Sequence, residues 1–222
     1  MVQVMSRLAF VGGTGPQGLG LAMRFAQAGE TVLIGSRSAS RADATASRIR
    51  AAVPGAVAEG VENLDAIARS ERIVLTLPAA ALPTFLETAR TPLAGKLVID
   101  VAVPVALRDG FFELAPVPGA PSAGELVQKA VPSARVVSAF KNVSAERLQD
   151  LSAALEGDVV LCGDDAAART EVAALVAKLP GLRAVDAGRL ANARYLEAIT
   201  ALLLNLNRRF RARTSIAIVG LG

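Results

Sequence analysis

The sequence predicts an α/β protein with a doubly wound parallel sheet, followed by a smaller C-terminal α/β domain. Two observations predict this class. Short apolar runs alternate with segments of helical spacing, which is the pattern of parallel strands joined by helices. A glycine-rich turn, Gly13 to Gly18, lies where the first apolar run, Leu8 to Val11, meets the first helical segment. The length of 222 residues fits one large domain with a small appendage.

The glycine-rich turn has the spacing G-x-G-x-x-G, carried by Gly13, Gly15 and Gly18. In this pattern the first glycine allows a tight turn, the second lets the backbone approach a pyrophosphate, and the third lets the helix pack closely. The helix that follows, Leu19 to Ala28, would add unpaired N–H groups and a partial positive charge. A plain glycine turn is the alternative, but a second strand at 31–35 completes a βαβ unit. The turn therefore predicts a dinucleotide-binding Rossmann domain.

The end of the second strand indicates which dinucleotide is bound. An NAD site usually has an acidic residue there, which accepts hydrogen bonds from the ribose. This chain has Ser36 and Arg37 instead, followed by Arg41. A hydroxyl and two guanidinium groups favour a 2′-phosphate, whereas an acid would repel it. We expect NADP rather than NAD; the alternative is that both arginines are merely solvated at a helix start.

The next elements complete the first domain. Expected strands cover 56–60, 72–78, 96–104 and 135–140, and expected helices cover 38–52, 63–70, 81–89 and 124–131. Six strands by about residue 140 make a full dinucleotide-binding sheet. Ligands of such sheets lie outside the carboxyl ends of the strands. The corner Leu77-Pro78-Ala79 is therefore a candidate cleft wall, although it could be an ordinary strand exit. Residues 111–121 are expected to form a loop.

The rest of the chain predicts a second unit. Strands are expected at 158–163, 182–186 and 215–219, and helices at 166–179 and 190–211. We place the boundary so that residues 1–155 form the NADP-binding domain and residues 156–222 form the small domain.

Composition excludes several classes of chemistry. The chain has no histidine and one cysteine, Cys162, so it has neither an imidazole acid or base nor a transition-metal ligand set. We expect no metal and no catalytic side chain. Catalysis would then come from a cofactor, which the protein positions.

Composition also indicates location and partners. No apolar run reaches the roughly 20 residues of a membrane span, and no signal peptide is evident. A lone cysteine fits a reducing cytoplasm. Aromatic residues make up 4% and tryptophan is absent, which disfavours nucleic-acid binding. The net charge of +4 suits an anionic small ligand. We therefore expect a cytoplasmic protein whose partners are small coenzymes, with no nucleic acid and no membrane.

Two sets of strings carry a resemblance to a known family. The first set is Gly12-Gly13-Thr14-Gly15, Gly18, Gly20-Leu21-Ala22, Arg24, Ala26, Ala28-Gly29 and Gly35-Ser36-Arg37. The second, more specific set is Cys162-Gly163-Asp164-Asp165, Pro180-Gly181-Leu182-Arg183, Val185-Asp186-Ala187-Gly188, Asn192-Ala193-Arg194 and Leu203-Leu204-Asn205-Leu206-Asn207-Arg208. Together they resemble the NADPH:F420 oxidoreductase family, also called NADPH-dependent F420 reductases, over essentially the whole chain.

The resemblance implies that NADP(H) binds to the N-terminal domain and that the deazaflavin F420 binds as co-substrate in a cleft against the small domain. It implies direct hydride transfer between nicotinamide C4 and deazaflavin C5, by a homodimer. The implied NADP-binding residues are Gly13, Thr14, Gly15, Pro16, Gln17, Gly18, Ser36, Arg37, Arg41, Leu77, Pro78, Ala79, Val103 and Ala145. The implied F420-binding residues are Pro104, Lys141, Asn142 and Val143.

One position departs from the family pattern. Several relatives have His-Thr after the sixth strand, where this chain has Lys141-Asn142. Lys141 could pair with the deazaflavin, or the acceptor could be another ring. Lys141 and the cluster 208–213 are also candidates for a basic rim, although such a charge run is more often a solvated face. The alternatives are a reductase of a flavin, ferric iron or an imine, and a non-catalytic NADP(H) sensor.

Overall fold

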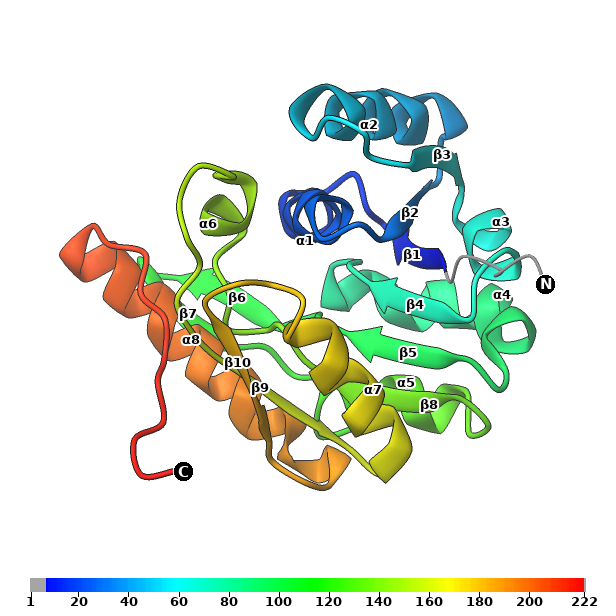
Figure 1. Ribbon diagram of the computed structural model, residues 1–222. Helices are drawn as coiled ribbons and strands as arrows, with labels where there is room; N and C mark the ends of the chain where they lie inside the picture. The colour runs from blue at the N-terminus through cyan, green and yellow to red at the C-terminus, as the bar shows by residue number, and fades with distance from the viewer. Residues whose placement is uncertain (1–6, 222) are drawn as a thin grey trace.

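A computed structural model describes residues 7–221, and its centre is one sheet of eight strands (Figure 1). The spatial order is β10-β9-β8-β5-β4-β1-β2-β3. The strands are β1 (Arg7–Val11), β2 (Thr31–Ser36), β3 (Ala58–Glu62), β4 (Arg72–Leu75), β5 (Leu97–Asp100), β8 (Arg135–Ser138), β9 (Gly157–Gly163) and β10 (Leu182–Asp186). The inner strands are near-continuous apolar runs buried on both faces, as parallel strands covered by helices require, whereas the edge strands β3 and β10 are partly exposed.

Six of these strands form the predicted doubly wound sheet. From β3 to β8 all neighbours are parallel, and the strand order reverses between β1 and β4. Such a reversal opens a crevice at the carboxyl ends, where ligands bind. The fold class is therefore confirmed, and it locates the candidate site above the ends of β1, β4, β5 and β8.

Helices cover both faces of the sheet. The core on one face takes in α1 (Pro16–Gln27), α2 (Ala39–Ala52), α6 (Ala145–Gln149) and α7 (Ala166–Val176). The core on the other face takes in α3 (Asn63–Ala68), α4 (Leu82–Leu93), α5 (Ala123–Ala130) and α8 (Ala193–Phe210). Short 3-10 turns, η1 (Ala79–Ala81) and η2 (Leu190–Asn192), precede α4 and α8. Within the described residues, no helix is long and apolar enough to cross a membrane.

The strands beyond residue 156 extend this sheet past β8. β9 runs antiparallel to β8, with Val137 opposite Gly163, and β10 runs parallel to β9. β9 and β10 therefore end on the side of the sheet opposite the crevice, and α8 returns the chain to the crevice. The division into residues 1–155 and 156–222 stays a prediction.

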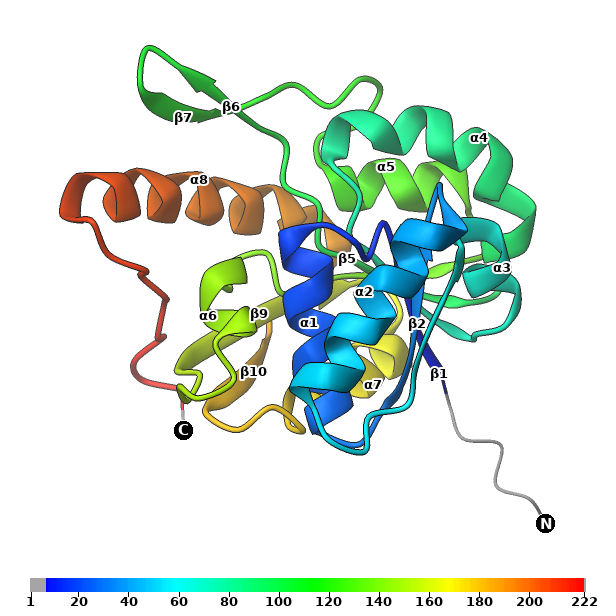
Figure 2. The ribbon, with the colours of Figure 1, turned by 90° about the horizontal axis from the view of Figure 1, so that it is seen from above.

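The segment expected as a loop at 111–121 contains a strand. β6 (Val105–Arg108) and β7 (Phe111–Leu114) form an antiparallel hairpin, whereas the expected strand 96–104 ends at Asp100. The turn residues Asp109 and Gly110 have φ of 49° and 81°, the left-handed pair that a two-residue hairpin turn needs. The hairpin projects from the body beside α8 (Figure 2).

The closing strand expected at 215–219 is also wrong. This segment runs extended beside β9, where the Asp158 N–H donates to the Ile216 carbonyl at 2.8 Å. The Ile218 N–H goes to the Asp158 carboxylate at 2.6 Å. A side chain thus takes the donor that a strand would give to a backbone ladder, and no strand forms there.

Candidate functional site

The glycines of the turn have two different steric roles. A Cβ at Gly13 would lie 2.8 Å from the Phe10 carbonyl oxygen, and one at Gly18 would lie 2.7 Å from Gly13 Cα. Both positions are buried and need glycine for packing within the protein. At Gly15 the nearest protein atom would be 3.7 Å away, the carbonyl oxygen of Gly12. Only the Gly15 side is open, so this is where a phosphate can approach the backbone.

Asn63 supports the turn from another strand connection. Its Oδ1 accepts the Gly12 N–H at 3.1 Å, and Gly12 has a φ of 73°. The Asn63 side chain is buried at the first position of α3, directly after β3. The sequence analysis used this asparagine only as a helix start. Because its partner lies 51 residues away, nothing local in the sequence indicated the contact.

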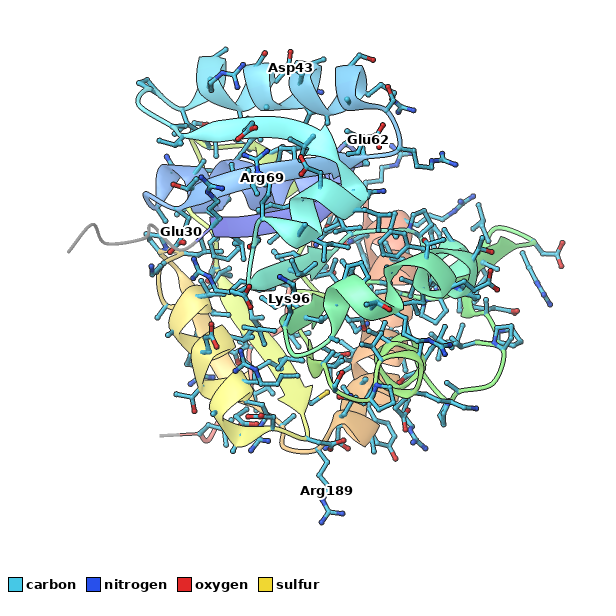
Figure 3. All side chains as sticks on the ribbon, turned by 90° about the vertical axis from the view of Figure 1, so that its right-hand side faces the viewer. Glu30, Asp43, Glu62, Arg69, Lys96 and Arg189 are labelled. Atoms are coloured by element: carbon cyan, nitrogen blue, oxygen red, sulfur yellow. The ribbon has the colours of Figure 1, made fainter. Side chains whose placement is uncertain are left out.

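A cavity of about 640 Å³ lies beside the end of β2. Its lining includes Ser36, Arg37, Glu62, Asn63, Leu77 and Pro78. Arg41 is exposed in the first turn of α2 and is not among the lining residues. Glu62, an acid that the sequence analysis did not consider, lies across from Ser36 at the carboxyl end of β3. Figure 3 shows Glu62 there, with Glu30 at the opposite end of the strands.

A second cavity, of about 800 Å³, shares Leu77 and Pro78 with the first. It joins the glycine turn to the carboxyl ends of β4, β5 and β8, as expected for a doubly wound sheet. The sequence-predicted residues that line it are Gly15, Pro16, Gln17, Leu77, Pro78, Ala79, Val103, Lys141, Asn142, Val143 and Ala145. These eleven residues come from four separate strand connections, so the fold brings most of the predicted site into one space.

Three predicted residues of the glycine turn, Gly13, Thr14 and Gly18, line neither cavity, and Pro104 does not line them either. Pro104 is buried at the base of the hairpin, where its carbonyl accepts the Ala115 N–H at 2.7 Å.

Helix α8 supplies a wall that the sequence analysis underestimated. Leu203, which was not among the predicted site residues, lines the cavity together with Thr200, Leu204 and Asn207. The only sequence indication was helical spacing, which does not say which face meets a ligand. Arg208, Arg211 and Arg213 also line this cavity, so part of the expected basic rim lies where it was predicted.

Lys141 does not belong to that rim. Its side chain is fully buried, and its Nζ donates to Asp100 Oδ2 at 2.6 Å, to Glu197 Oε1 at 3.3 Å and to the Ala102 carbonyl. An ammonium group has three donors, and these contacts use all of them. Lys141 therefore lies under the cavity as a support, without a donor for a bound ring.

The acids around Lys141 are tightly held. Asp100 is fully buried and also accepts from the Ser138 hydroxyl at 2.9 Å and the Ala102 N–H at 3.0 Å. Burial raises the pKa of Glu197, and the nearby Lys141 ammonium opposes that rise. The three side chains form one buried ion cluster, in which removing one member would leave the others without their partner.

Other reactive groups are scarce in the described part of the chain. Burial raises the pKa of the Cys162 thiol to about 12, so this thiol stays protonated and is a poor nucleophile. Among residues 7–221 no group of three or more acidic, cysteine or histidine side chains could hold a metal ion. The site offers shape, apolar walls and fixed donors.

The fold and the glycine turn define a doubly wound protein of the Rossmann class. Residues 7–104 match the family described as NADP oxidoreductase, coenzyme F420-dependent. The chain is 39% identical to the F420-dependent NADP reductase of Methanothermobacter thermautotrophicus, covering 97% of this chain and 95% of that protein. It is 35% identical to the F420-dependent NADP reductase of Methanocaldococcus jannaschii, covering 97% and 99%.

A crystal structure from Arthrobacter sp. FB24, provisionally named an F420-dependent NADP reductase, is similar with a TM-score of 0.81 and 26% identity. It covers 98% of this chain, and this chain covers all of it. The identity over nearly the full length of two reductases settles the family. The chain belongs to the F420-dependent NADP reductase family.

Proposed function

We propose that this protein transfers a hydride between NADP(H) and the deazaflavin coenzyme F420. One observation carries the proposal: the larger cavity joins the glycine turn to the ends of β4, β5 and β8 and to α8 in a single space. Family membership makes F420 the second ring. Hydride transfer between stacked rings needs reacting carbons about 3–3.5 Å apart, which is a problem of alignment.

The proposed NADP(H) side begins at Gly15, where the backbone is open, and ends at Ser36 and Arg37 in the smaller cavity. The pyrophosphate would then lie at the α1 N-terminus, where the helix dipole favours negative charge. Leu77 and Pro78 line both cavities, so a nicotinamide would pass them. When both coenzymes are bound, the hydride would pass between the nicotinamide C4 of NADP(H) and C5 of F420.

The proposed F420 side consists of Asn142, Val143 and α8, with Val103 and Ala145 near the junction of the two rings. Lys141 supports this wall from below. Residues 156–222 would thus form the small domain that closes the cleft, since they include α8. Its apolar surface excludes water, which strengthens electrostatic contacts to the bound rings.

The direct test mixes the protein with NADPH and oxidised F420 and follows the deazaflavin absorbance. We expect the absorbance of oxidised F420 to fall when both NADPH and the protein are present, and to stay constant when the protein is left out. Bleaching of FAD or FMN without bleaching of F420 would overturn the proposal and favour another acceptor. Tight NADPH binding without transfer to any acceptor would favour the sensor.

We propose a homodimer on the evidence of exposed apolar side chains. They lie on the hairpin and on α8: Leu107, Phe111, Leu114, Tyr195, Leu202 and Phe210. Phe112 and Asn205 join the two elements by reciprocal hydrogen bonds of 2.8 Å. Exposed apolar side chains gathered on neighbouring elements are typical of contact sites. Light scattering should give twice the chain mass, and Leu202→Glu should lower it; a monomeric wild type would refute the dimer.

We also place the protein in the cytoplasm, because its one cysteine is buried and unpaired. Cell fractionation tests this, and recovery from a membrane or extracellular fraction would contradict it.

A further inference from the structure

The connection after β8 contains an unusual backbone turn. Phe140 has a φ of 57°, in the left-handed region that a bulky residue rarely adopts. Its ring is fully buried and packs edge-to-face on Phe25, with 5.9 Å between centroids. Such a conformation persists only where the surroundings hold it. The turn 140–143 carries three cavity-lining residues, so its shape decides that wall of the site.

Contacts from other elements hold this turn. The side-chain amide of Gln17 donates to the Phe140 carbonyl at 3.2 Å and to the Val143 carbonyl at 3.3 Å. Asn142 Nδ2 donates to the Asp158 carbonyl at 2.6 Å. The Thr200 hydroxyl lies 3.1 Å from the Lys141 carbonyl. Gln17 alone among these partners belongs to the glycine-turn side of the cavity, at the second residue of α1.

The resemblance implied that Gln17 binds NADP, and its place in the glycine loop would put it at the pyrophosphate, but its side-chain donors are engaged elsewhere. A glutamine amide has two N–H donors, and both go to the carbonyls of the turn. What remains of the side chain is its oxygen, an acceptor that a phosphate would repel, whereas the Gln17 backbone N–H, in the first turn of α1, is still a donor for a phosphate. The side-chain contacts of Gln17 therefore point away from a phosphate role for that side chain.

We propose that Gln17 is a positioning residue that fixes the distance between the glycine turn and the strained turn 140–143. Since the two turns carry the two coenzyme sides of the cavity, Gln17 would set the separation of the two rings; this consequence rests on the proposed function. Its effect would be on transfer rather than on NADPH binding.

The surrounding contacts allow Gln17 to be changed without unfolding the region. Arg24 is buried and holds the segment after α6, donating to the Leu148 carbonyl at 2.9 Å and the Ala153 carbonyl at 3.0 Å. Gln149 Nε2 donates to the Pro16 carbonyl at 3.0 Å and does not line the cavity. Gln149 therefore provides a matched control: an amide on the same α1–α6 contact that leaves the turn untouched.

The first experiment needs no substrate. Hydrogen–deuterium exchange of the peptide spanning 139–146 is compared in wild type, Gln17→Met and Gln149→Met, because methionine keeps the length and removes the donors. We expect faster exchange in Gln17→Met and no change in Gln149→Met. If the lost hydrogen bonds lower the free energy of local opening by roughly 1.4 kcal/mol, exchange in Gln17→Met becomes about tenfold faster. Equal exchange in all three proteins would overturn the positioning role.

The second experiment separates transfer from binding. NADPH affinity is measured by fluorescence titration, and kcat by F420 bleaching. We expect Gln17→Met to lower kcat about tenfold, since a shift of 1 Å can cost roughly a hundredfold. NADPH Kd should stay within about twofold, as it should in Gln149→Met. A large rise in NADPH Kd with unchanged kcat would restore the pyrophosphate role. A wild type that does not bleach F420 would refute the function, while the exchange result would still decide the positioning role.

Discussion

The two sides of the larger cavity are built in different ways. The glycine-turn side is held mainly by backbone contacts within the first βαβ unit, such as the Gly13 N–H to the Gly35 carbonyl at 3.0 Å, with the Asn63 side chain as an added support. The side formed by the turn 140–143 is held by side chains from distant elements, including Gln17, 123 residues from its partner Phe140. The first side therefore depends on glycines, which have no side chain. The second side depends on specific side chains.

The two sides should therefore be sensitive to different kinds of substitution. Adding atoms should damage the glycine turn, whereas removing atoms should damage the side around Lys141.

Lys141→Met should destabilise the protein by about 3–5 kcal/mol, because it leaves the buried Asp100 without its cation. Urea unfolding measures the change. Lys129→Met is the control, since Lys129 bonds only the Gly119 carbonyl at an exposed site and should matter by less than about 0.5 kcal/mol. A loss below about 1 kcal/mol for Lys141→Met would mean that the buried cluster is not needed for the fold.

Arg37→Glu should weaken NADPH binding by about 2–3 kcal/mol, the range of a hydrogen bond to a charged group. That corresponds to roughly 30- to 150-fold in Kd. NADH lacks the 2′-phosphate, so its binding should hardly change, and titration of both cofactors gives the comparison. Arg48→Glu, on the exposed face of α2, is the matched charge reversal. Equal losses for NADPH and NADH would contradict the 2′-phosphate role.

Gly18→Ala should cost about 1–3 kcal/mol of stability by overpacking, since its Cβ would meet Gly13 Cα at 2.7 Å. Gly15→Ala should leave thermal stability unchanged, because the nearest protein atom is 3.7 Å away. We expect Gly15→Ala nevertheless to weaken NADPH binding, since the new methyl group would occupy the space of a phosphate. Thermal unfolding with NADPH titration separates the two outcomes; normal affinity in Gly15→Ala would move the phosphate elsewhere.

Asp158→Asn should have the smallest effect, visible as a pH dependence. The Arg183 guanidinium lowers the pKa of Asp158, against the desolvation that raises it, and the Ile218 N–H adds to the lowering. A carboxyl whose folded pKa is lowered stabilises the fold above its unfolded pKa of about 3.9, and that stability is lost as pH falls through the folded value.

The free energies of unfolding of wild type and Asp158→Asn should therefore differ at pH 7, and the difference should shrink only as pH falls below about 4 and through the lowered folded pKa. Asp109→Asn, at the exposed hairpin tip, is the matched control. A constant difference between wild type and Asp158→Asn would show that the carboxylate charge is not what holds the 215–219 segment.

The sequence predicted those parts that local chemistry decides. The parallel sheet and the family follow from patterns within short windows, and both are confirmed. The NADP-binding role of the glycine turn stays a prediction. The role of Lys141 could not be predicted, because Asp100 and Glu197 lie 41 and 56 residues away from it.

Two errors have local causes. Asp109-Gly110 is a residue pair typical of two-residue hairpin turns. The prolines that follow it led instead to the prediction of a loop. Residues 215–219 have strand composition, but composition does not show that the Asp158 carboxylate takes a backbone donor there. Short apolar runs are therefore ambiguous until their hydrogen-bond partners are known.

The reversal of β9 against β8 makes the length of α8 matter. The chain leaves β10 at the far edge, and the 18 residues of α8 return it over about 27 Å to the cavity. The length of α8 thus sets the distance between Glu197, which lies under the site, and Arg211, which lies at its rim. Inserting or deleting one residue would rotate the cavity-lining face by about 100°. We therefore expect α8 to tolerate few changes of length, whereas the projecting hairpin tip should accept them freely.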